Sequence, residues 1–259
     1  MASILKMNLS GKRKQLYEGS SKILFEGPDS DTIIAHFKDE VTVASTNETI
    51  AVAGKGALNN RISEYLMLKL DSLGIATHFI KNINMREQLV RRLDVIPLQV
   101  VIRNVAAGDI CTRFGMEEGV VLPKPIIEFF LKSTNLKDPL VTEDHIEAFG
   151  WAGAFEMEEI RNIAIRANDF LTGLFLGCGI RLIDFKLEFG RSFGHDFEQV
   201  IIADEITPDT CRLWDMKTNV KMDQEGVKLE GFPPDKGYLE IARRLGILPE
   251  TSNVEELYS

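Results

Sequence analysis

From residue 182 to residue 189, ionic residues alternate with apolar ones. Side chains along a β-strand point to opposite faces in turn, so this alternation predicts a strand with one apolar face and one ionic face. Asp184, Lys186 and Glu188 share the ionic face. A second apolar strand follows a glycine-bounded turn and ends at Asp204. Such a hairpin would gather carboxylates around a lysine.

Carboxylates around a lysine suit phosphoryl chemistry. Mg2+ prefers hard oxygen ligands and is usually held by one or two carboxylates together with substrate phosphates. Glu188 and Asp204 are therefore the candidate metal ligands, and Lys186 would neutralise a transferring phosphoryl group. A solvated sheet face with surface ion pairs, each worth about 0–1 kcal/mol, explains the same pattern and is favoured when the pattern is considered alone.

A turn of Gly19, Ser20 and Ser21 precedes Lys22, between two short strand-like segments. Glycine lets backbone N–H groups approach phosphate oxygens, and a following lysine supplies positive charge. The chain has no G-x-x-x-x-G-K-[ST] motif, so the turn is not a phosphate loop of that class. An ordinary hairpin turn is the more common meaning, and the Gly-Lys-Gly segment at 54–56 has the same ambiguity.

Two further segments place arginine beside small or polar residues. Arg103 is followed by Asn-Val-Ala-Ala-Gly and then by Asp109, and a polar segment from 204 contains Arg212 and Trp214. Arginine grips phosphate or carboxylate with a two-pronged fork. The alternative interpretations are a strand-to-helix connection with Asp109 as N-cap, and a turn anchored by a buried Trp214.

The elements that would position these residues follow from periodicity and turn residues. Apolar residues recur at helical spacing over 156–176, and an amphipathic helix is expected over 59–72. Strands are expected at 16–18, 22–26 and 32–37, and an extended run at 93–103. Proline is poorly tolerated within a central strand, so Pro97 suggests an edge, a strand start or a lobe boundary.

Composition narrows the class of protein. The 259 residues are 44% hydrophobic and carry a formal net charge of −9, which makes nucleic acid an unlikely partner. No apolar stretch approaches the roughly 20 residues of a membrane span, and no secretory signal is recognisable. Three widely spaced cysteines and four isolated histidines favour neither disulfides nor a zinc site. A reducing cytoplasm is the expected location.

Taken together, the motifs resemble the SAICAR synthase (phosphoribosylaminoimidazole-succinocarboxamide synthase) family over nearly the full length. The blocks that carry the resemblance are L-Y-E-G-S-S-K at 16–22, G-K-G-A-L-N-N at 54–60, V-I-R-N-V-A-A-G-D at 101–109, D-P-L-V-T-E-D-H-I at 138–146, L-I-D-F-K-L-E-F-G at 182–190 and A-D-E-I-T-P-D-T-C-R-L-W-D at 203–215.

This resemblance implies an α+β fold of two lobes, a small antiparallel β lobe over a larger α+β lobe, related to ATP-grasp enzymes and kinases. Residues 1–97 would form the nucleotide-binding lobe and residues 98–259 the lobe with the metal and substrate site. The implied reaction is the ATP- and Mg2+-dependent joining of L-aspartate to a phosphoribosyl-imidazole carboxylate through an acyl phosphate. A homodimer is also implied.

The resemblance also implies roles for individual residues. Lys186, Lys22 and Asp184 would be catalytic, and Glu188 and Asp204 would hold Mg2+. ATP would be bound by Gly19, Ser20, Ser21, Lys22, Asp94 and Leu98. The imidazole nucleotide would be bound by Arg103, Arg212, Asp209, Asn59 and Asn60.

Two positions depart from the family pattern, which commonly has lysine at Ser20 and serine at Asp109. ATP contact is therefore expected to rely more on Lys22 and on backbone amides. An ionised Asp109 would repel a substrate phosphate, so it is expected to turn away and cap the following helix. The alternatives are a small-molecule kinase, which would not need an amino acid, and a silent nucleotide-binding module, which the intact Lys186 and Glu188 disfavour.

Overall fold

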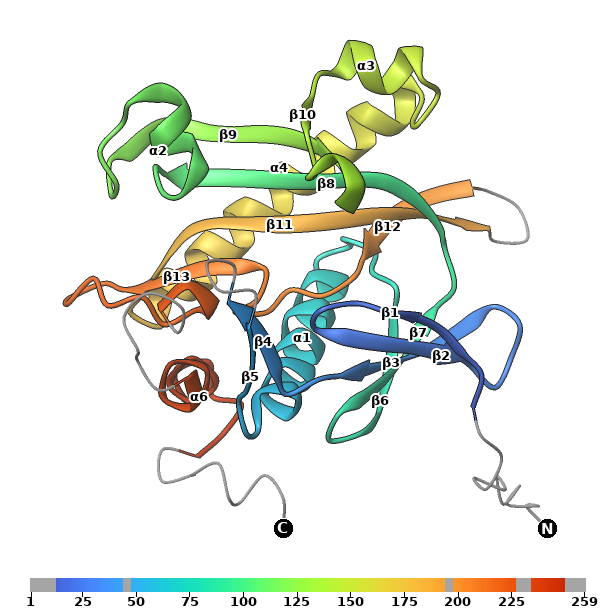
Figure 1. Cartoon of the computed structure of the whole chain (residues 1–259), viewed down its shortest axis with the longest axis horizontal. Coiled ribbons are helices and arrows are strands. Elements are labelled where there is room, and N and C mark those ends of the chain that lie inside the picture. Colours follow the sequence, from blue (N-terminus) through green and yellow to red (C-terminus); the bar gives the residue numbers. More distant parts are fainter. Residues whose placement is uncertain (1–12, 44–47, 194–197, 227–233, 250–259) are drawn as a thin grey trace.

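The structure is a computed structural model that describes residues 13–43, 48–193, 198–226 and 234–249. The first part of the chain forms strands β1 (Gln15–Glu18), β2 (Lys22–Glu26), β3 (Thr32–Phe37), β4 (Glu40–Val43) and β5 (Glu48–Ala51), helix α1 (Lys55–Ser72), and strands β6 (Phe79–Asn84) and β7 (Glu87–Arg91). β1, β2, β3, β7 and β6 make one antiparallel sheet in that order, while β4 and β5 pair separately (Figure 1).

The rest of the chain forms a second antiparallel sheet with helices around it. Its strands are β8 (Asp94–Val105), β9 (Val121–Leu131), β10 (Leu140–Val141), β11 (Ile180–Phe193), β12 (Glu198–Ala203) and β13 (Cys211–Asp215). The order is β10-β9-β8-β11-β12, and β13 also pairs with β11. The helices are α2 (Asp109–Phe114), the 3-10 turn η1 (Thr134–Leu136), α3 (Glu143–Ala148), α4 (Ala154–Gly177) and α6 (Pro234–Arg244).

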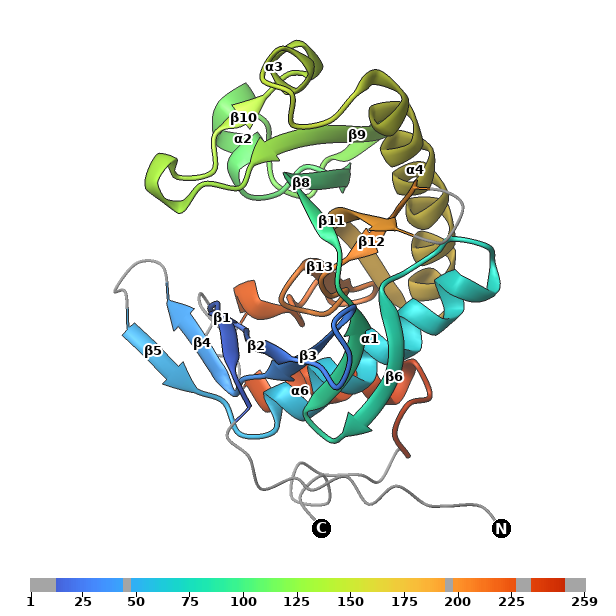
Figure 2. The same ribbon diagram turned by 90° about the vertical axis from the view of Figure 1, so that its right-hand side faces the viewer.

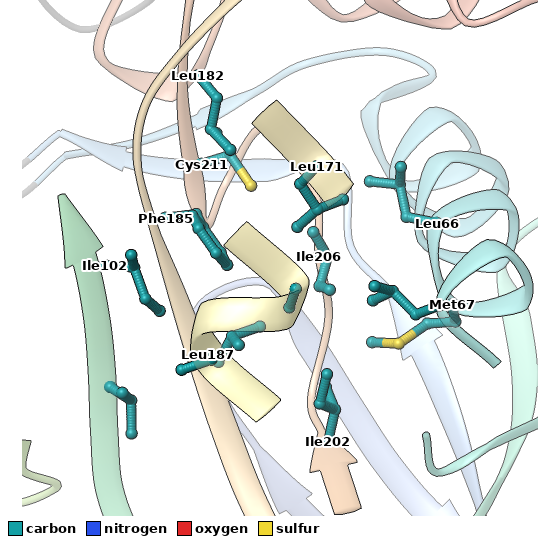
Figure 3. Packing of buried hydrophobic residues seen from close by; sticks show 14 of the residues in the cluster. Leu66, Met67, Ile102, Leu171, Leu182, Phe185, Leu187, Ile202, Ile206 and Cys211 are labelled. Atoms are coloured by element: carbon teal, nitrogen blue, oxygen red, sulfur yellow. The ribbon is translucent and has the colours of Figure 1, made fainter. Parts of the chain in front are cut away.

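β11 is the strand around which the second sheet is organised. Figure 2 shows α4 on one side of this sheet and the β1–β2 hairpin on the other. Phe185, Leu187 and Phe189 of β11 are buried in the main hydrophobic core. Figure 3 shows this core, in which β11 packs with α4, with α1 and with β8. The apolar face predicted from the alternation therefore faces α4.

The ionic face of β11 is not a solvated surface. Asp184 is 4% exposed and Glu188 is 7% exposed. Pairing with β8 sets Asp184 opposite Arg103, Lys186 opposite Val101 and Glu188 opposite Gln99. The interpretation of this face as surface ion pairs is therefore wrong, because buried charges require specific partners.

One residue of the predicted apolar face differs. Ile183 packs with Val105, Ala107 and Trp214 in a separate cluster, away from the main core. The register between β11 and β13 shifts between Leu182 and Asp184. An irregularity of this kind re-aims the side chains beside it, which explains why the alternation fails at this end of the strand.

Most expected helices and strands are present, and several are longer than expected. α1 begins at Lys55 rather than at Asn59, and β11 extends to Phe193 through most of the expected turn at 190–194; residue 194 lies outside the described ranges. Pro97 lies within central β8, opposite a register shift in β11 between Glu188 and Gly190. Proline is tolerated at such bulges because no ladder hydrogen bond from its nitrogen is needed.

The architecture confirms the α+β class with antiparallel sheets. One hydrophobic cluster takes residues from α1, α4, β11 and α6, so α1 shares its core with the second half of the chain. The division at residue 97 and the relation to ATP-grasp enzymes stay predictions. Within the described ranges, none of the helices has the length and apolar character needed to cross a bilayer.

Candidate active site

Two neighbouring cavities lie on the ionic side of β11. The first, here named the hairpin cavity, has a volume of about 530 Å3 and is lined by the tip between β1 and β2, by β3, β7 and β8, and by the ends of β11 and β12. The second, named the arginine cavity, has a volume of about 560 Å3 and is lined by Arg103 and Arg212 among others. Gln99, Asp138 and Lys186 line both.

Lys186 stands at the junction of the two cavities. Its backbone N–H donates to the Thr210 carbonyl at 2.8 Å, which fixes the strand beside the following loop. Its half-buried ammonium forms no hydrogen bond or ion pair with any described residue. In contrast, Lys22 pairs with Asp204 and Lys132 pairs with Glu188. Lys186 is thus a cation held between two cavities and available to a ligand in either.

The hairpin tip is tied to the end of β12. Gly19, Ser20, Ser21 and Lys22 all line the hairpin cavity. The backbone N–H of Gly19 donates to the Lys22 carbonyl at 2.8 Å, and the Ser21 hydroxyl donates to Glu205 at 2.8 Å. The Lys22 ammonium hydrogen-bonds Asp204 and lies 3.3 Å from Glu205. These contacts hold a glycine- and serine-rich turn over a buried charged cluster.

The two candidate metal ligands have opposite pKa shifts. Burial, followed by the negative charge of Asp204, raises the pKa of Glu188 above its ordinary value. Burial also raises the pKa of Asp204, but Lys22 and Lys186 outweigh it and hold that pKa below its ordinary range. Asp204 has a backbone φ of 59°, in the left-handed region that residues other than glycine adopt uncommonly. Such residues are frequent at functional sites.

These two carboxylates fit a Mg2+ ion in their donor chemistry. Both are oxygen donors that line the hairpin cavity, and each carries an ammonium partner in this structure. Mg2+ is typically bound by one or two carboxylates plus substrate phosphates. This pair of carboxylates lies in the same cavity as the Gly-Ser-Ser turn. Among the described residues, no group of three or more His, Cys, Asp or Glu side chains is arranged to hold a metal alone.

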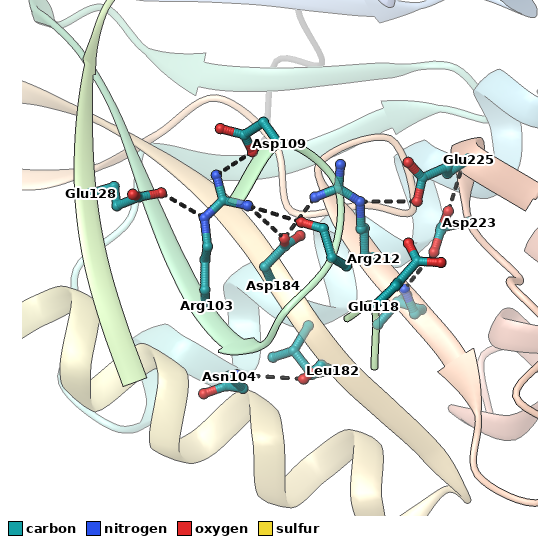
Figure 4. A network of polar contacts seen from close by, with 12 residues as sticks. Arg103, Asn104, Asp109, Glu118, Glu128, Leu182, Asp184, Arg212, Asp223 and Glu225 are labelled. Carbon is teal, nitrogen blue, oxygen red and sulfur yellow. Dashed lines mark hydrogen bonds and ion pairs between the residues drawn. The ribbon is translucent and has the colours of Figure 1, made fainter. Parts of the chain in front are cut away.

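Arg103 and Arg212 meet at one buried carboxylate in the arginine cavity (Figure 4). Nη1 of Arg103 lies 3.2 Å from Asp184, and Nη1 of Arg212 lies 2.6 Å from the same oxygen. Burial raises the pKa of Asp184 despite both arginines. Arg103 also binds Glu128 and Asp109, and Arg212 binds Glu225. The arginine forks are held in fixed positions on the cavity wall.

Gly108 allows the approach of Arg212. Its φ is +67°, and a Cβ atom there would lie 2.4 Å from Nη2 of Arg212. A side chain at this position would be strained by the backbone and would push the guanidinium away. The small residues after Arg103 therefore serve to bring the two arginines together.

A sequence model described as SAICAR synthetase matches residues 15–244. The chain belongs to the SAICAR synthetase family. It is 54% identical over 239 residues to the phosphoribosylaminoimidazole-succinocarboxamide synthase of Acidiphilium cryptum (strain JF-5), covering 92% of this chain and 94% of that protein. The family assignment made from the sequence motifs is confirmed.

Solved structures of the family share the fold. The crystal structure of the Ehrlichia chaffeensis phosphoribosylaminoimidazole-succinocarboxamide synthase has a TM-score of 0.88 at 43% identity, covering 92% of this chain and 100% of that chain. A SAICAR synthetase structure in complex with ADP has a TM-score of 0.85 at 36% identity, covering 90% of this chain and 97% of that chain.

Two residues expected at the ATP site do not line the hairpin cavity. Leu98 is 1% exposed and belongs to the main core, and Asp94 pairs with Arg191 at 3.0 Å. Leu93 and Val95, on either side of Asp94, line the cavity instead, as does Gln99, the residue after Leu98. The side chains of Asp94 and Leu98 point away from the cavity, since alternate residues of β8 face opposite sides. Contact of ATP with this connection stays a prediction.

The expected role of Asp109 as a helix cap is also wrong. Gly108 occupies the N-cap position of α2, without a side-chain cap, and Asp109 is the first helical residue. Its carboxylate instead accepts hydrogen bonds from Nη2 of Arg103 at 2.7 Å and from Nε of Arg113 at 3.1 Å. Asp109 lines the arginine cavity rather than turning away from it.

Asp209 lines the arginine cavity, but its carboxylate is heavily engaged. It lies 2.5 Å from the ammonium of Lys55, accepts from Asn59 at 2.8 Å and accepts from Tyr238. Asn59 thus reaches the cavity only through Asp209. Asn60 lines neither cavity and bonds to the Asn84 carbonyl at 2.8 Å, so its predicted contact with substrate is not supported by its position.

Several residues of the site were missed from the sequence. Lys132 and Asp138 come from the loop after β9, and Glu205 follows the predicted metal ligand Asp204. Gln99 of β8 is the register partner of Glu188 on the neighbouring strand β11. Asp138 belongs to the D-P-L-V-T-E-D-H-I block, which could have pointed to it. Lys132 had no signal, because its pairing with Glu188 depends on tertiary structure.

Proposed function

We propose that the protein joins L-aspartate to 5-amino-1-(5-phosphoribosyl)imidazole-4-carboxylate, with conversion of ATP to ADP and phosphate, in purine biosynthesis. A carboxylate does not condense with an amine in water because its leaving group would be oxide. An oxygen of the substrate carboxylate therefore attacks the γ-phosphorus of ATP, ADP leaves, and the amine of aspartate then displaces phosphate from the acyl carbon. Family membership and the paired cavities support this reaction.

The observation that carries the proposal is the position of Lys186. It lines both cavities, and its ammonium forms no hydrogen bond or ion pair with the described residues. A phosphoryl group that passes from one cavity to the other must cross this junction. A fixed positive charge there stabilises the charge that spreads over the transferring oxygens.

The hairpin cavity is assigned to ATP. The backbone of Gly19, Ser20 and Ser21 and the ammonium of Lys22 would contact the phosphates, and the apolar lining from β3 and β7 would cover the base. Glu188 and Asp204 would hold Mg2+, which when bound neutralises phosphate charge and orients the γ-phosphate. Lys22 and Lys132 would then exchange carboxylate partners for phosphate oxygens.

The arginine cavity is assigned to the imidazole nucleotide. Its carboxylate must lie beside Lys186 to receive the phosphoryl group, so its ribose phosphate lies towards Arg103 and Arg212. Asp184 orients both guanidinium groups. Asp209 positions the loop before β13, with Asn59 and Lys55 behind it.

Assembly and location complete the proposal. The protein acts in the cytoplasm as a homodimer, with its first 97 residues supplying most of the nucleotide site. Three free cysteines fit a reducing compartment. Phe149 and Phe155, 65% and 89% exposed, are candidates for contact between two copies. Analytical ultracentrifugation of the wild type and Phe155→Ser would test this contact.

The test of the function is aspartate dependence. Purified protein is mixed with Mg-ATP and the imidazole nucleotide, with and without L-aspartate, and ADP and succinocarboxamide are measured. The ligase gives equal amounts of both products only when aspartate is present. ADP release with a phosphorylated nucleotide and no amide would establish a small-molecule kinase instead.

A further inference from the structure

The arginine cavity contains more carboxylates than cations, although it is assigned to an anionic nucleotide. Its cationic lining residues are Arg103, Lys186 and Arg212. Its acidic lining residues are Asp109, Asp138, Asp184, Asp209, Asp223 and Glu225. A phosphate entering this cavity must therefore compete with carboxylates of the protein for the arginine donors.

The carboxylates on Arg103 differ in how freely they can leave. Asp184 and Glu128 have side chains that are 5% and 9% exposed, so they are enclosed with the arginine. The side chain of Asp109 is 50% exposed and lines the arginine cavity. Exposed side chains change rotamer within nanoseconds. Asp109 is the partner of Arg103 that can move aside.

A second arginine, Arg113, also binds the Asp109 carboxylate. Arg113, one helical turn further along α2, donates from Nε to the other oxygen of Asp109 at 3.1 Å. Arg113 is itself held by Glu128 at 2.6 Å. The carboxylate can therefore leave Arg103 without losing all of its charged partners.

We propose that Asp109 is an internal competitor for the substrate phosphate: it occupies Nη2 of Arg103 in the free protein and is retained by Arg113 when the phosphate displaces it. This inference rests on the proposed function for the identity of the nucleotide. It makes Asp109 a residue that sets affinity for the nucleotide and has no part in phosphoryl transfer.

The test is Asp109→Asn, which removes the charge and keeps the shape. The KM for the imidazole nucleotide falls about tenfold, while kcat and the KM values for ATP and aspartate stay within about twofold. Asp144→Asn, the same change at an exposed position on α3, leaves all four constants unchanged. An unchanged or higher nucleotide KM in Asp109→Asn would overturn the proposal.

Arg113→Ala gives an effect of opposite sign. With Arg113 gone, Asp109 has only Arg103 to bind, so the nucleotide KM rises. The rise disappears when Arg113→Ala is made in the Asp109→Asn background, because the competitor is already neutral. A rise of equal size in both backgrounds would mean that Arg113 acts through Glu128 and would contradict the retention of Asp109.

Binding of ribose 5-phosphate, measured by calorimetry, separates this inference from the proposed function. It needs no turnover and reports on the phosphate subsite alone. Asp109→Asn binds ribose 5-phosphate about tenfold more tightly than the wild type. A wild type that lacks aspartate-dependent turnover would refute the ligase, and equal binding by the two proteins would refute the competitor.

Discussion

The hairpin cavity and the arginine cavity share three lining residues but hold their charges in different ways. The hairpin cavity uses lysines, and its cations, which include Lys22, Lys132 and Lys186, outnumber its carboxylates. The arginine cavity uses two guanidinium forks, and its carboxylates are in excess. A lysine is a compact charge that readily changes partner, whereas an arginine held by several carboxylates keeps one orientation.

This difference suits the two substrates proposed. ATP arrives with a polyphosphate and a metal ion, so its site benefits from mobile positive charge. The imidazole nucleotide must place one carboxylate beside Lys186, so its site benefits from rigid recognition. Reactants held in a fixed relative geometry can gain effective molarities of roughly 10^5 to 10^8 M.

The largest expected effect concerns the rigidity of the arginine cavity. Asp184→Ala leaves buried Arg103 and partly buried Arg212 without their common carboxylate and lowers the free energy of unfolding by about 3–5 kcal/mol. Urea denaturation measures the change. Asp169→Ala, on the exposed face of α4, serves as the control and changes stability by about 0.5 kcal/mol or less. A loss below about 1 kcal/mol for Asp184→Ala would show that the arginines are held by their other partners.

Next in size is the loss of charge at the junction. Lys186→Met lowers kcat about 10^2- to 10^3-fold, because a group that stabilises the transferring phosphoryl is removed. Steady-state ADP release measures kcat, and circular dichroism checks the fold. Lys124→Met, an exposed lysine that lines neither cavity, keeps wild-type activity. A less than fivefold effect of Lys186→Met would remove Lys186 from the mechanism.

The burial of Asp223 in the wall of the arginine cavity predicts a pH dependence of stability. Burial raises the pKa of Asp223 from 3.8 to about 6 in the folded protein. The folded state then binds a proton that the unfolded state has already released, so stability falls as pH rises between about 4 and 6. The loss from this group is about 3 kcal/mol above pH 6.

Asp223→Asn isolates that contribution. The difference in unfolding free energy between wild type and variant is measured by urea denaturation from pH 4 to pH 7. Asn cannot accept both backbone N–H bonds that Asp223 accepts from Leu213 and Glu225, so the variant is less stable at pH 4. The wild-type advantage then shrinks as pH rises, and a difference that stays constant would contradict the account.

The smallest expected effect tests the close approach of backbone and guanidinium. Gly108→Ala places a Cβ atom against Arg212 and raises the KM for the imidazole nucleotide about tenfold. Gly115→Ala is the matched control, since its φ is +62° and nothing lies within 4 Å of an added Cβ. Gly115→Ala loses about 1 kcal/mol of stability from its left-handed backbone, and Gly108→Ala loses more because its φ and ψ of 67° and −136° suit almost only glycine. Only Gly108→Ala loses affinity.

The sequence predicted the ionic face of β11 well because alternation is a local property of the strand. It could not distinguish a solvated face from a buried one, since that depends on distant partners: Lys22 of the hairpin tip binds Asp204, and Lys132 binds Glu188. The side chain of Leu98 does not line the cavity because Ile96, Leu98, Val100 and Ile102 form one buried apolar row. Residues of the other parity, such as Val95 and Gln99, face the cavity.

Asp109 shows where local rules fail. An aspartate before a short helix usually caps it, and the sequence therefore predicted a cap. In the structure, Gly108 is the N-cap residue, and the Asp109 carboxylate pairs at 2.7 Å with buried Arg103, six residues earlier in the chain. Lys132 and Tyr238 were missed for a different reason, because their partners Glu188 and Asp209 lie far away in the sequence.

The central claim is that the carboxylate of the imidazole nucleotide, bound in the arginine cavity, accepts the γ-phosphoryl group of ATP bound in the hairpin cavity. Imidazole nucleotide labelled with 18O in its carboxylate tests this directly, with mass spectrometry of the phosphate released. The account predicts one 18O atom in each phosphate formed per turnover. Phosphate without label, with both carboxylate oxygens accounted for in the product or in water, would contradict it.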